Sequence, residues 1–277
     1  MTIKDILVHV DGSRAMPGRV AAAAGLAQRH DAHLTGLCII ELPVLPSYAE
    51  AQIPTEIIRG QRQAFVARAE ASEKQFSRIT SEYNIRAEWR CVEDRRLDAL
   101  LLHARYVDLV ICGQDDPTDP NCESRGLGAG VALESGRPVL LIPAKGEFNV
   151  IGDNIVVAWD TKREAVRAIS DAMPILETAR RVSVITINAQ AADPENRGLP
   201  AADIGLHLAR HGVETQAKNL FGAPAAVGEL LLAAAQDESA DLLVMGAYGH
   251  AQLRETVFGG VTAHVLAQTD IPVLFSH

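Results

Sequence analysis

The chain has 277 residues, of which 48% are apolar and 22% charged, and its formal net charge is −9. This composition is typical of a globular protein, and the length is enough for one large domain or two domains of common size. The negative charge argues against a nucleic-acid surface. No apolar run approaches the ~20 residues that span a bilayer, so we expect no membrane segment and a cytoplasmic location.

Short apolar runs alternate with helical patterns along the first half of the chain. The strands are expected at residues 4–10, 33–40, 85–92, 107–113 and 138–142. The helices are expected at residues 14–30, 55–83, 95–106 and 123–135. Nearly continuous apolar strands separated by helices indicate a parallel sheet that is covered on both faces.

The second half repeats this organisation. DILVHVDGS near the start corresponds to NIVVAWDTK in the middle, and both apolar runs end in an aspartate, Asp11 and Asp160. The expected strands are 154–159, 181–187, 213–219, 241–246 and 272–276. The expected helices are 162–179, 200–211, 224–237 and 257–268. A pattern written twice at this spacing indicates a duplicated domain.

The sequence therefore predicts an α/β fold of two tandem, open, five-stranded parallel-sheet sandwiches with helices on both faces. We place the first domain at residues 1–146 and the second at 152–277, because the segment between them is polar and contains glycine. Ligands of such sheets bind outside the carboxyl ends of the strands. Asp11, Asp160 and Gly246 are all expected at that edge.

One glycine-rich segment stands out near the end of the chain. GAYG, from Gly246 to Gly249, ends an expected strand, and after nine residues GGVT opens the last helix at Gly259. Glycine lets another group approach the backbone closely, and a helix N-terminus attracts phosphate. The segment is a candidate phosphate cradle, although glycines at strand ends are also ordinary turn residues.

This spacing closely resembles the Gx2Gx9G(S/T) signature of the universal stress protein family. The resemblance extends to both halves, through ILVHVDGS, the repeated strand and helix order, and the closing PVLL and PVLF strands. It implies a sheet order of 3-2-1-4-5 in each half. It also implies an intrachain pseudo-dimer formed across the last strands. Pairing of two chains into a homodimer stays open.

The resemblance also implies ATP as the ligand of the second half, alone or with Mg²⁺. The residues that match the family's nucleotide site are Ala158, Asp160, Ile187, Met245, Gly246, Gly249, Gly259, Gly260, Val261 and Thr262. Asp160 and the end of the second strand would hold the adenosine, and the glycines with the last helix would hold the phosphates. At Gly260 the family usually has serine or threonine, so this chain lacks one hydroxyl donor to phosphate.

The first half departs further from the signature. No second glycine follows Gly113 at the required spacing, and Asp115, Asp116 and Asp119 lie where phosphates would bind. Neighbouring carboxylates repel a triphosphate unless they share a metal, and an acidic loop in solvent is the simpler interpretation, so we expect no metal site. We therefore expect the first half to keep the fold and Asp11 but to lack a nucleotide site.

No catalytic motif stands beside these features. We expect a nucleotide-dependent stress or signalling module with an unidentified protein partner and, at most, slow ATP hydrolysis. The alternatives are a nucleotide-free interaction or chaperone-like protein with two vestigial clefts, and a weak ATPase.

The buried residue types complete the expectations. His9 is expected in the core, and Cys38, Cys91 and Cys112 as reduced packing residues, whereas Cys122 lies in a polar loop.

Overall fold

The computed structural model describes residues 2–42, 55–188, 200–247 and 260–277. Its first half contains β1 (Asp5–Val10), α1 (Met16–His30), β2 (His33–Ile40), α3 (Thr55–Ser81), β3 (Arg86–Glu93), α4 (Arg96–Ala104), β4 (Leu109–Gly113), α5 (Leu127–Glu134) and β5 (Val139–Ile142). Its second half contains β6 (Asn154–Ala158), α6 (Arg163–Leu176), β7 (Arg181–Ile187), α7 (Pro200–Arg210), β8 (Thr215–Leu220), η1 (Pro224–Ala226), α8 (Val227–Asp237), β9 (Leu242–Gly246), α9 (Gly260–Gln268) and β10 (Val273–Ser276).

The strands form one ten-stranded sheet in the order β3-β2-β1-β4-β5-β10-β9-β6-β7-β8. The expected order 3-2-1-4-5 is confirmed in both halves, since the second half contains it in reverse across the sheet. All pairs within a half are parallel, whereas β5 and β10 pair antiparallel, with Leu140 opposite Leu274. The two sheets are thus joined rather than separate, because each last strand covers the edge that the other would leave unpaired.

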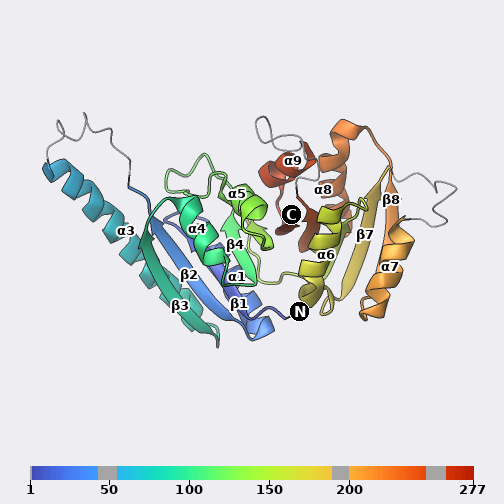
Figure 1. Ribbon diagram of the computed structural model, residues 1–277, viewed down its shortest axis with the longest axis horizontal. Helices are drawn as coiled ribbons and strands as arrows, with labels where there is room; N and C mark the ends of the chain where they lie inside the picture. The colour runs from blue at the N-terminus through green and yellow to red at the C-terminus, as the bar shows by residue number, and fades with distance from the viewer. Residues whose placement is uncertain (1, 43–54, 189–199, 248–259) are drawn as a thin grey trace.

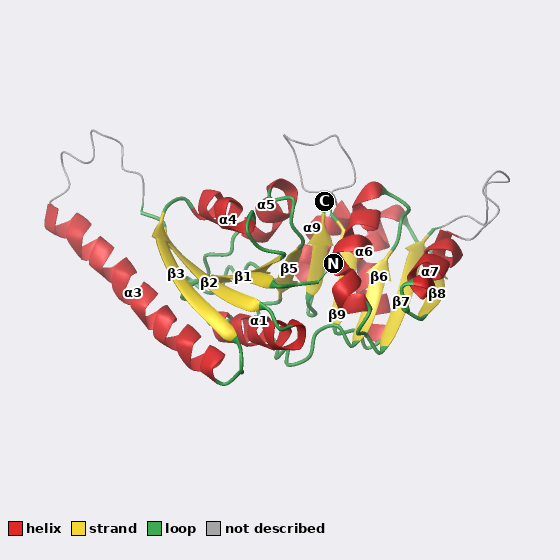
Figure 2. Ribbon diagram, turned by 60° about the horizontal axis from the view of Figure 1, so that its bottom comes forward, coloured by secondary structure: helices red, strands yellow, loops and turns green. Residues whose placement is uncertain are grey.

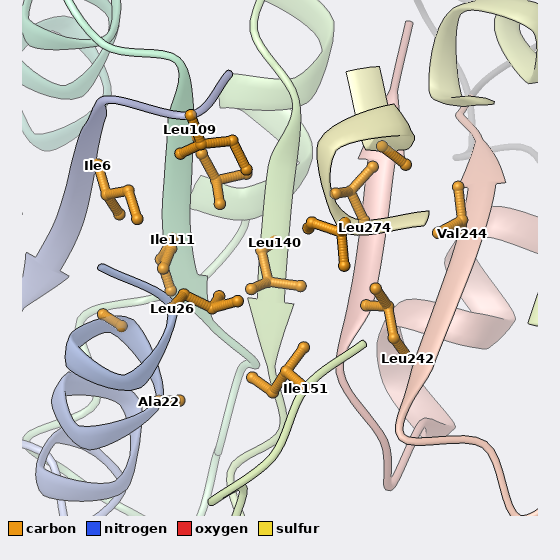
Figure 3. Close-up of a cluster of buried hydrophobic side chains, with 14 of the residues drawn as sticks. Ile6, Ala22, Leu26, Leu109, Ile111, Leu140, Ile151, Leu242, Val244 and Leu274 are labelled. Carbon is orange, nitrogen blue, oxygen red and sulfur yellow. The ribbon is translucent and has the colours of Figure 1, made fainter. Parts of the chain in front are cut away.

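Helices cover both faces of this sheet, as Figures 1 and 2 show. One apolar cluster lies under α1, α3, α6 and α7, and the other under α4, α5, α8 and α9. Each cluster contains residues of both halves, so the core continues across the junction. Figure 3 shows Leu140 of β5 beside Leu274 of β10 within the first cluster. The intrachain pseudo-dimer therefore has a shared interior.

Polar contacts also connect the halves. The guanidinium of Arg29 in α1 donates to Ile151 O at 2.9 Å and to the Asp153 carboxylate at 2.9 Å. Gln114, which follows β4, donates through Nε2 to Leu266 O at 3.0 Å and Thr269 O at 3.1 Å. These are carbonyls at the C-terminal end of α9, which otherwise lack intrahelical partners. The first half thus holds the end of the helix whose N-terminus is the expected phosphate seat.

The ends of the observed strands and helices lie within a few residues of the expected ends. The largest difference is α5, which we expected from residue 123 but which begins at Leu127. Gly126 takes a left-handed conformation with φ of 69° directly before it, and the preceding residues bond to Asp11 instead of forming a helical turn. Of the expected helix over 257–268, the part before Gly260 lies outside the described residues. No helix among the described residues is long and apolar enough to cross a membrane.

Candidate functional site

The second half brings its candidate residues to one edge of the sheet. β6 pairs with β7 on one side and with β9 on the other. The carboxyl end of β6 is therefore the switch point of the sheet, where the connections to the neighbouring strands run in opposite directions. Asp160 follows β6, Ile187 ends β7 and Gly246 ends β9. Ala158, Ile187, Met245 and Val261 also contribute to the same apolar cluster. The structure therefore places these four of the ten predicted residues on the α8 and α9 side of the sheet.

Asp160 presents an accessible carboxylate there. Its side chain is 55% exposed and lies 3.2 Å from the Lys162 ammonium. The backbone N–H of Lys162 also donates to it at 3.1 Å, which is possible because Thr161 takes a left-handed φ of 64°. An exposed ion pair of this kind contributes only ~0–1 kcal/mol. The carboxylate is therefore available to a ligand's hydroxyl or amino group at little cost.

Gly246 has a packing role that the sequence did not reveal. A Cβ atom at this position would lie 2.6 Å from Ala165 N and 2.6 Å from the Glu164 carbonyl carbon. The end of β9 therefore rests directly on the first turn of α6, and only glycine leaves enough space. The expected loop glycine is thus also a contact between a strand and a helix.

Only part of the expected phosphate seat lies in the described last helix. Gly260 is exposed, and a Cβ atom there would have no neighbour within 4 Å among the described residues. Thr262 is buried at 5% exposure, two residues into α9. The other two glycines of the signature, Gly249 and Gly259, lie outside the described residues. The phosphate part of the predicted site therefore stays a prediction.

The corresponding edge of the first half is filled by protein. The Arg19 guanidinium reaches from α1 to the Asp11 carboxylate at 2.7 Å and to His9 O at 2.8 Å. A Cβ atom at Gly113 would lie only 2.0 Å from Arg19 Nη1. The space beside the end of β4 thus holds a buried arginine. In the second half the residue eight positions after the aspartate is Ala168, and the space beside the end of β9 is taken by the first turn of α6.

Both carboxylate oxygens of Asp11 accept hydrogen bonds from the protein. One carboxylate oxygen accepts from the N–H and the hydroxyl of Ser13, at 3.1 and 2.6 Å, in addition to Arg19. The other accepts from Glu123 N at 3.2 Å. Burial alone would raise the pKa of Asp11, but Arg19 and Ser13 overcome that effect and hold the pKa well below its usual range. The carboxylate is therefore ionised and used within the protein.

The acidic loop after β4 is internally bonded as well. Asp119 accepts from Arg14 N at 2.7 Å, Asp116 from Thr118 N at 2.9 Å, and Asp115 from Gly126 N at 3.1 Å. Burial raises the pKa of Asp115. Within the ranges that the structure describes, no group of three or more His, Cys, Asp or Glu side chains is placed to hold a metal ion.

One feature of this edge was missed from the sequence. It is Arg19, a lone arginine in the run RVAAAAGLA, eight residues after Asp11. His9 is buried as expected, and neither ring nitrogen has a hydrogen-bond partner in the part of the chain that the structure describes. Burial lowers the pKa of His9 to about 4, with smaller opposing and supporting effects from Asp11, Arg19 and Arg96. His9 is thus a neutral imidazole inside the sheet.

The fold defines a duplicated, doubly wound α/β protein, in which the aspartate at the switch point is exposed in the second half and buried in the first. Residues 153–277 match the model of the universal stress protein family. A universal stress protein of Synechocystis sp. is 33% identical over 94 residues, which cover 33% of this chain and 30% of that relative. This match places the second half of the chain, residues 153–277, in the universal stress protein family.

Solved structures share the fold of the whole chain. A universal stress protein from Archaeoglobus fulgidus DSM 4304 has a TM-score of 0.77 at 16% identity, covering 99% of this chain and 96% of that one. A functionally unknown protein from Pseudomonas aeruginosa PAO1 has a TM-score of 0.61 at 18% identity, covering 99% and 92%. Both likenesses span the two halves, so the tandem arrangement is a shared fold.

Proposed function

We propose that this protein is an ATP-binding stress-response or signalling module with a single competent nucleotide site, in the second half. The observation that carries the proposal is the contrast between two equivalent aspartates. The Asp160 side chain is 55% exposed, whereas that of Asp11 is fully buried against Arg19. Only the former can accept a hydrogen bond from a ligand without breaking the core.

The proposed binding mode follows from the placement of the other residues. Asp160 accepts bonds from the ribose hydroxyls, and the adenine lies against the apolar wall near Ala158 and Ile187. The phosphates lie at the N-terminus of α9, where free N–H groups and the helix dipole attract negative charge. Occupancy would change the surface that a protein partner meets near residues 247–260. Mg²⁺ would accompany the triphosphate as its counterion.

A nucleotide-free interaction module is the second candidate. Gly260 favours it, because glycine lacks the hydroxyl that the family signature places at this point. The lost hydrogen bond is worth about 0.5–1.5 kcal/mol, which weakens phosphate binding without removing the backbone donors. In that case both clefts would be vestigial, and the protein would act through its surface alone.

The two candidates are separated by direct measurement of bound nucleotide. Freshly purified protein is denatured, and the released small molecules are identified by chromatography and mass spectrometry. Calorimetry with ATP and magnesium then gives the stoichiometry. We expect about one adenine nucleotide per chain. An empty protein that also shows no heat with ATP would favour the nucleotide-free module.

A matched pair of variants assigns the site. Asp160→Ala removes a carboxylate that is 55% exposed and 3.2 Å from Lys162. Asp98→Ala removes one that is 53% exposed and 3.4 Å from Arg95, on the far side of the first half. We expect the first variant to bind ATP at least tenfold more weakly and the second to bind it like the wild type. Equal affinities in the two variants would refute Asp160 as a ligand-binding residue.

Two further measurements complete the assignment. Gly249→Val, in the segment outside the described residues, should abolish binding and leave the fold intact if the glycines seat phosphates. Phosphate release from ATP with and without magnesium tests for hydrolysis. We expect release close to the uncatalysed background, and a metal-dependent rate clearly above it would identify a weak ATPase.

A further inference from the structure

Two cysteines face each other across neighbouring strands of the first half. Cys38 of β2 and Cys91 of β3 are direct register partners in the parallel pair. Both project to the α3 side, because Gly36 and Trp89, two residues earlier in each strand, contact Phe76 of α3. The two thiols therefore lie on one face of the sheet at the same level.

Side chains at this position come into contact in the other half as well. Thr186 is the sixth residue of β7, as Cys38 is of β2, and its register partner on β8 is Asn219. The Thr186 hydroxyl lies 3.1 Å from the Asn219 carbonyl oxygen. Burial raises the pKa of the Cys38 thiol, and the neighbouring Cys91 thiol raises it further. Neighbouring strands lie about 4.8 Å apart, within the roughly 4.4–6.8 Å between Cα atoms that a disulfide allows.

The two thiols differ in their exposure to solvent. Cys91 is exposed, contrary to our expectation of a packing residue, because β3 is the edge strand, and Cys38 is buried. An exposed sulfur can meet a small oxidant, and its buried neighbour is protected until the first has reacted. The other cysteines have different surroundings. Cys112 is fully buried in the cluster on the opposite face, and the Cys122 sulfur accepts from Asp116 N at 3.4 Å.

We propose that Cys38 and Cys91 form a reversible oxidation site, in which a peroxide converts the dithiol to an intrachain disulfide. The Cys91 thiolate attacks a peroxide oxygen, the O–O bond breaks, and the departing hydroxide takes a proton to become water. The sulfur of Cys38 then attacks the Cys91 sulfenic acid, so an S–S bond forms, the S–O bond breaks and a second water leaves. Two thiols are oxidised and one hydrogen peroxide is reduced, with two electrons transferred.

The disulfide would lie beside the Asp11 end of the first-half sheet. Cys38 lines a small cavity beneath α3, together with Asp11, Arg68, Ser72 and Glu123. A bond to Cys91 would fix this wall of the cavity to the edge strand β3. Oxidation therefore has a defined target, the packing of α3 on β2 and β3, which is remote from Asp160.

Attack by a thiolate also makes the rate of disulfide formation depend on pH. Burial raises the pKa of Cys91, and the nearby Glu73 adds to this effect. The thiolate fraction is consequently small at neutral pH and grows about tenfold per pH unit below the pKa. We expect disulfide formation to be slow at pH 7 and several-fold faster at pH 8.

The test uses the full chain treated with hydrogen peroxide. Intact mass should fall by two hydrogens, peptide mapping should link Cys38 to Cys91, and a dithiol reductant should restore the starting mass. Cys122→Ser is the matched control and should form the same disulfide. Cys38→Ser should stop at a Cys91 sulfenic acid that dimedone traps. Further oxidation of Cys91 in the wild type with Cys38 still reduced would overturn the proposal.

A second measurement does not depend on oxidation. Phenylarsine oxide bridges two thiols only when they are close together, so it reports their geometry in the reduced protein. We expect one bridging adduct per chain in the wild type and in Cys122→Ser, and none in Cys38→Ser or Cys91→Ser. A bridge that survives in Cys38→Ser, or a wild type that forms none, would contradict the assigned pair.

Discussion

Arg19 donates a 2.7 Å hydrogen bond to Asp11 between two side chains that are almost completely buried. At the equivalent place in the second half, Ala168 leaves Asp160 without such a partner. The aspartate that follows the first strand of each half is therefore used differently. It is buried in an ion pair in the first half and 55% exposed in the second.

The buried pair predicts a large cost when one partner is removed. Arg19→Ala leaves the Asp11 carboxylate buried without its counter-charge, which destabilises proteins by about 3–5 kcal/mol. We expect a loss of this size in the free energy of unfolding by urea. Trp89 and Trp159 lie in different halves, so single-tryptophan versions can follow each half separately.

Arg14→Ala provides the control for this prediction. Its side chain is 74% exposed and lies 3.8 Å from the buried Asp119 carboxylate. In the variant Asp119 keeps its backbone donors, Arg14 N at 2.7 Å and Asn121 N at 3.0 Å, and an ion pair with an exposed arginine contributes only about 0–1 kcal/mol. We expect this variant to unfold nearly like the wild type. If Arg19→Ala lost equally little stability, the buried Arg19–Asp11 ion pair would not stabilise the fold.

The sequence predicted the strands and helices well because each strand is a short apolar run between polar turns. The sheet order followed from the family resemblance. The sequence could not reveal the exposure of Cys91, because the residues of an edge strand resemble those of an inner strand until the strand pairing is known. It also missed Arg19, since an arginine inside an alanine-rich helix is usually on the surface. Only the fold shows that this helix position faces Asp11.

His9 predicts a specific loss of stability in mild acid. Its folded pKa is about 4, below the ordinary 6.5, so the unfolded chain takes up the proton first. Stability is therefore complete above pH 6.5 and falls as the pH drops toward 4, by about 3 kcal/mol in total from this residue. Urea unfolding of the wild type at pH 7, 5.5 and 4 measures the loss.

His9→Leu isolates this effect, because leucine fills the core without a titrating group. We expect a shallower loss between pH 7 and 4. Asp11 adds to the loss below about pH 4 in both proteins, because Arg19 and Ser13 hold its pKa low and its contribution disappears as the carboxylate is protonated. Parallel pH curves for the two proteins would mean that His9 is not neutral in the folded state.

The contact at Gly246 predicts opposite results for two glycines. Gly246→Ala forces a methyl group within 2.6 Å of the α6 backbone, and such overpacking costs about 1–3 kcal/mol. Gly25 in α1 has no atom within 4 Å of the added carbon, so Gly25→Ala should stabilise the helix by roughly 0.5–1 kcal/mol. Thermal unfolding of both variants checks the prediction, and a harmless Gly246→Ala would disprove the close packing.

Gly260 offers the sharpest test of where phosphates bind. The Cβ atom of a serine there would meet none of the described residues within 4 Å, and its hydroxyl would restore the donor that the family signature contains. One added hydrogen bond is worth about 0.5–1.5 kcal/mol, or about 2- to 12-fold in affinity. We expect Gly260→Ser to bind ATP more tightly by this factor in calorimetry, with unchanged thermal stability in the absence of nucleotide. Because the site is at the start of α9, adenosine should gain nothing from the same substitution. A gain for adenosine equal to that for ATP would place the hydroxyl away from the phosphates and leave the N-terminus of α9 without its proposed role.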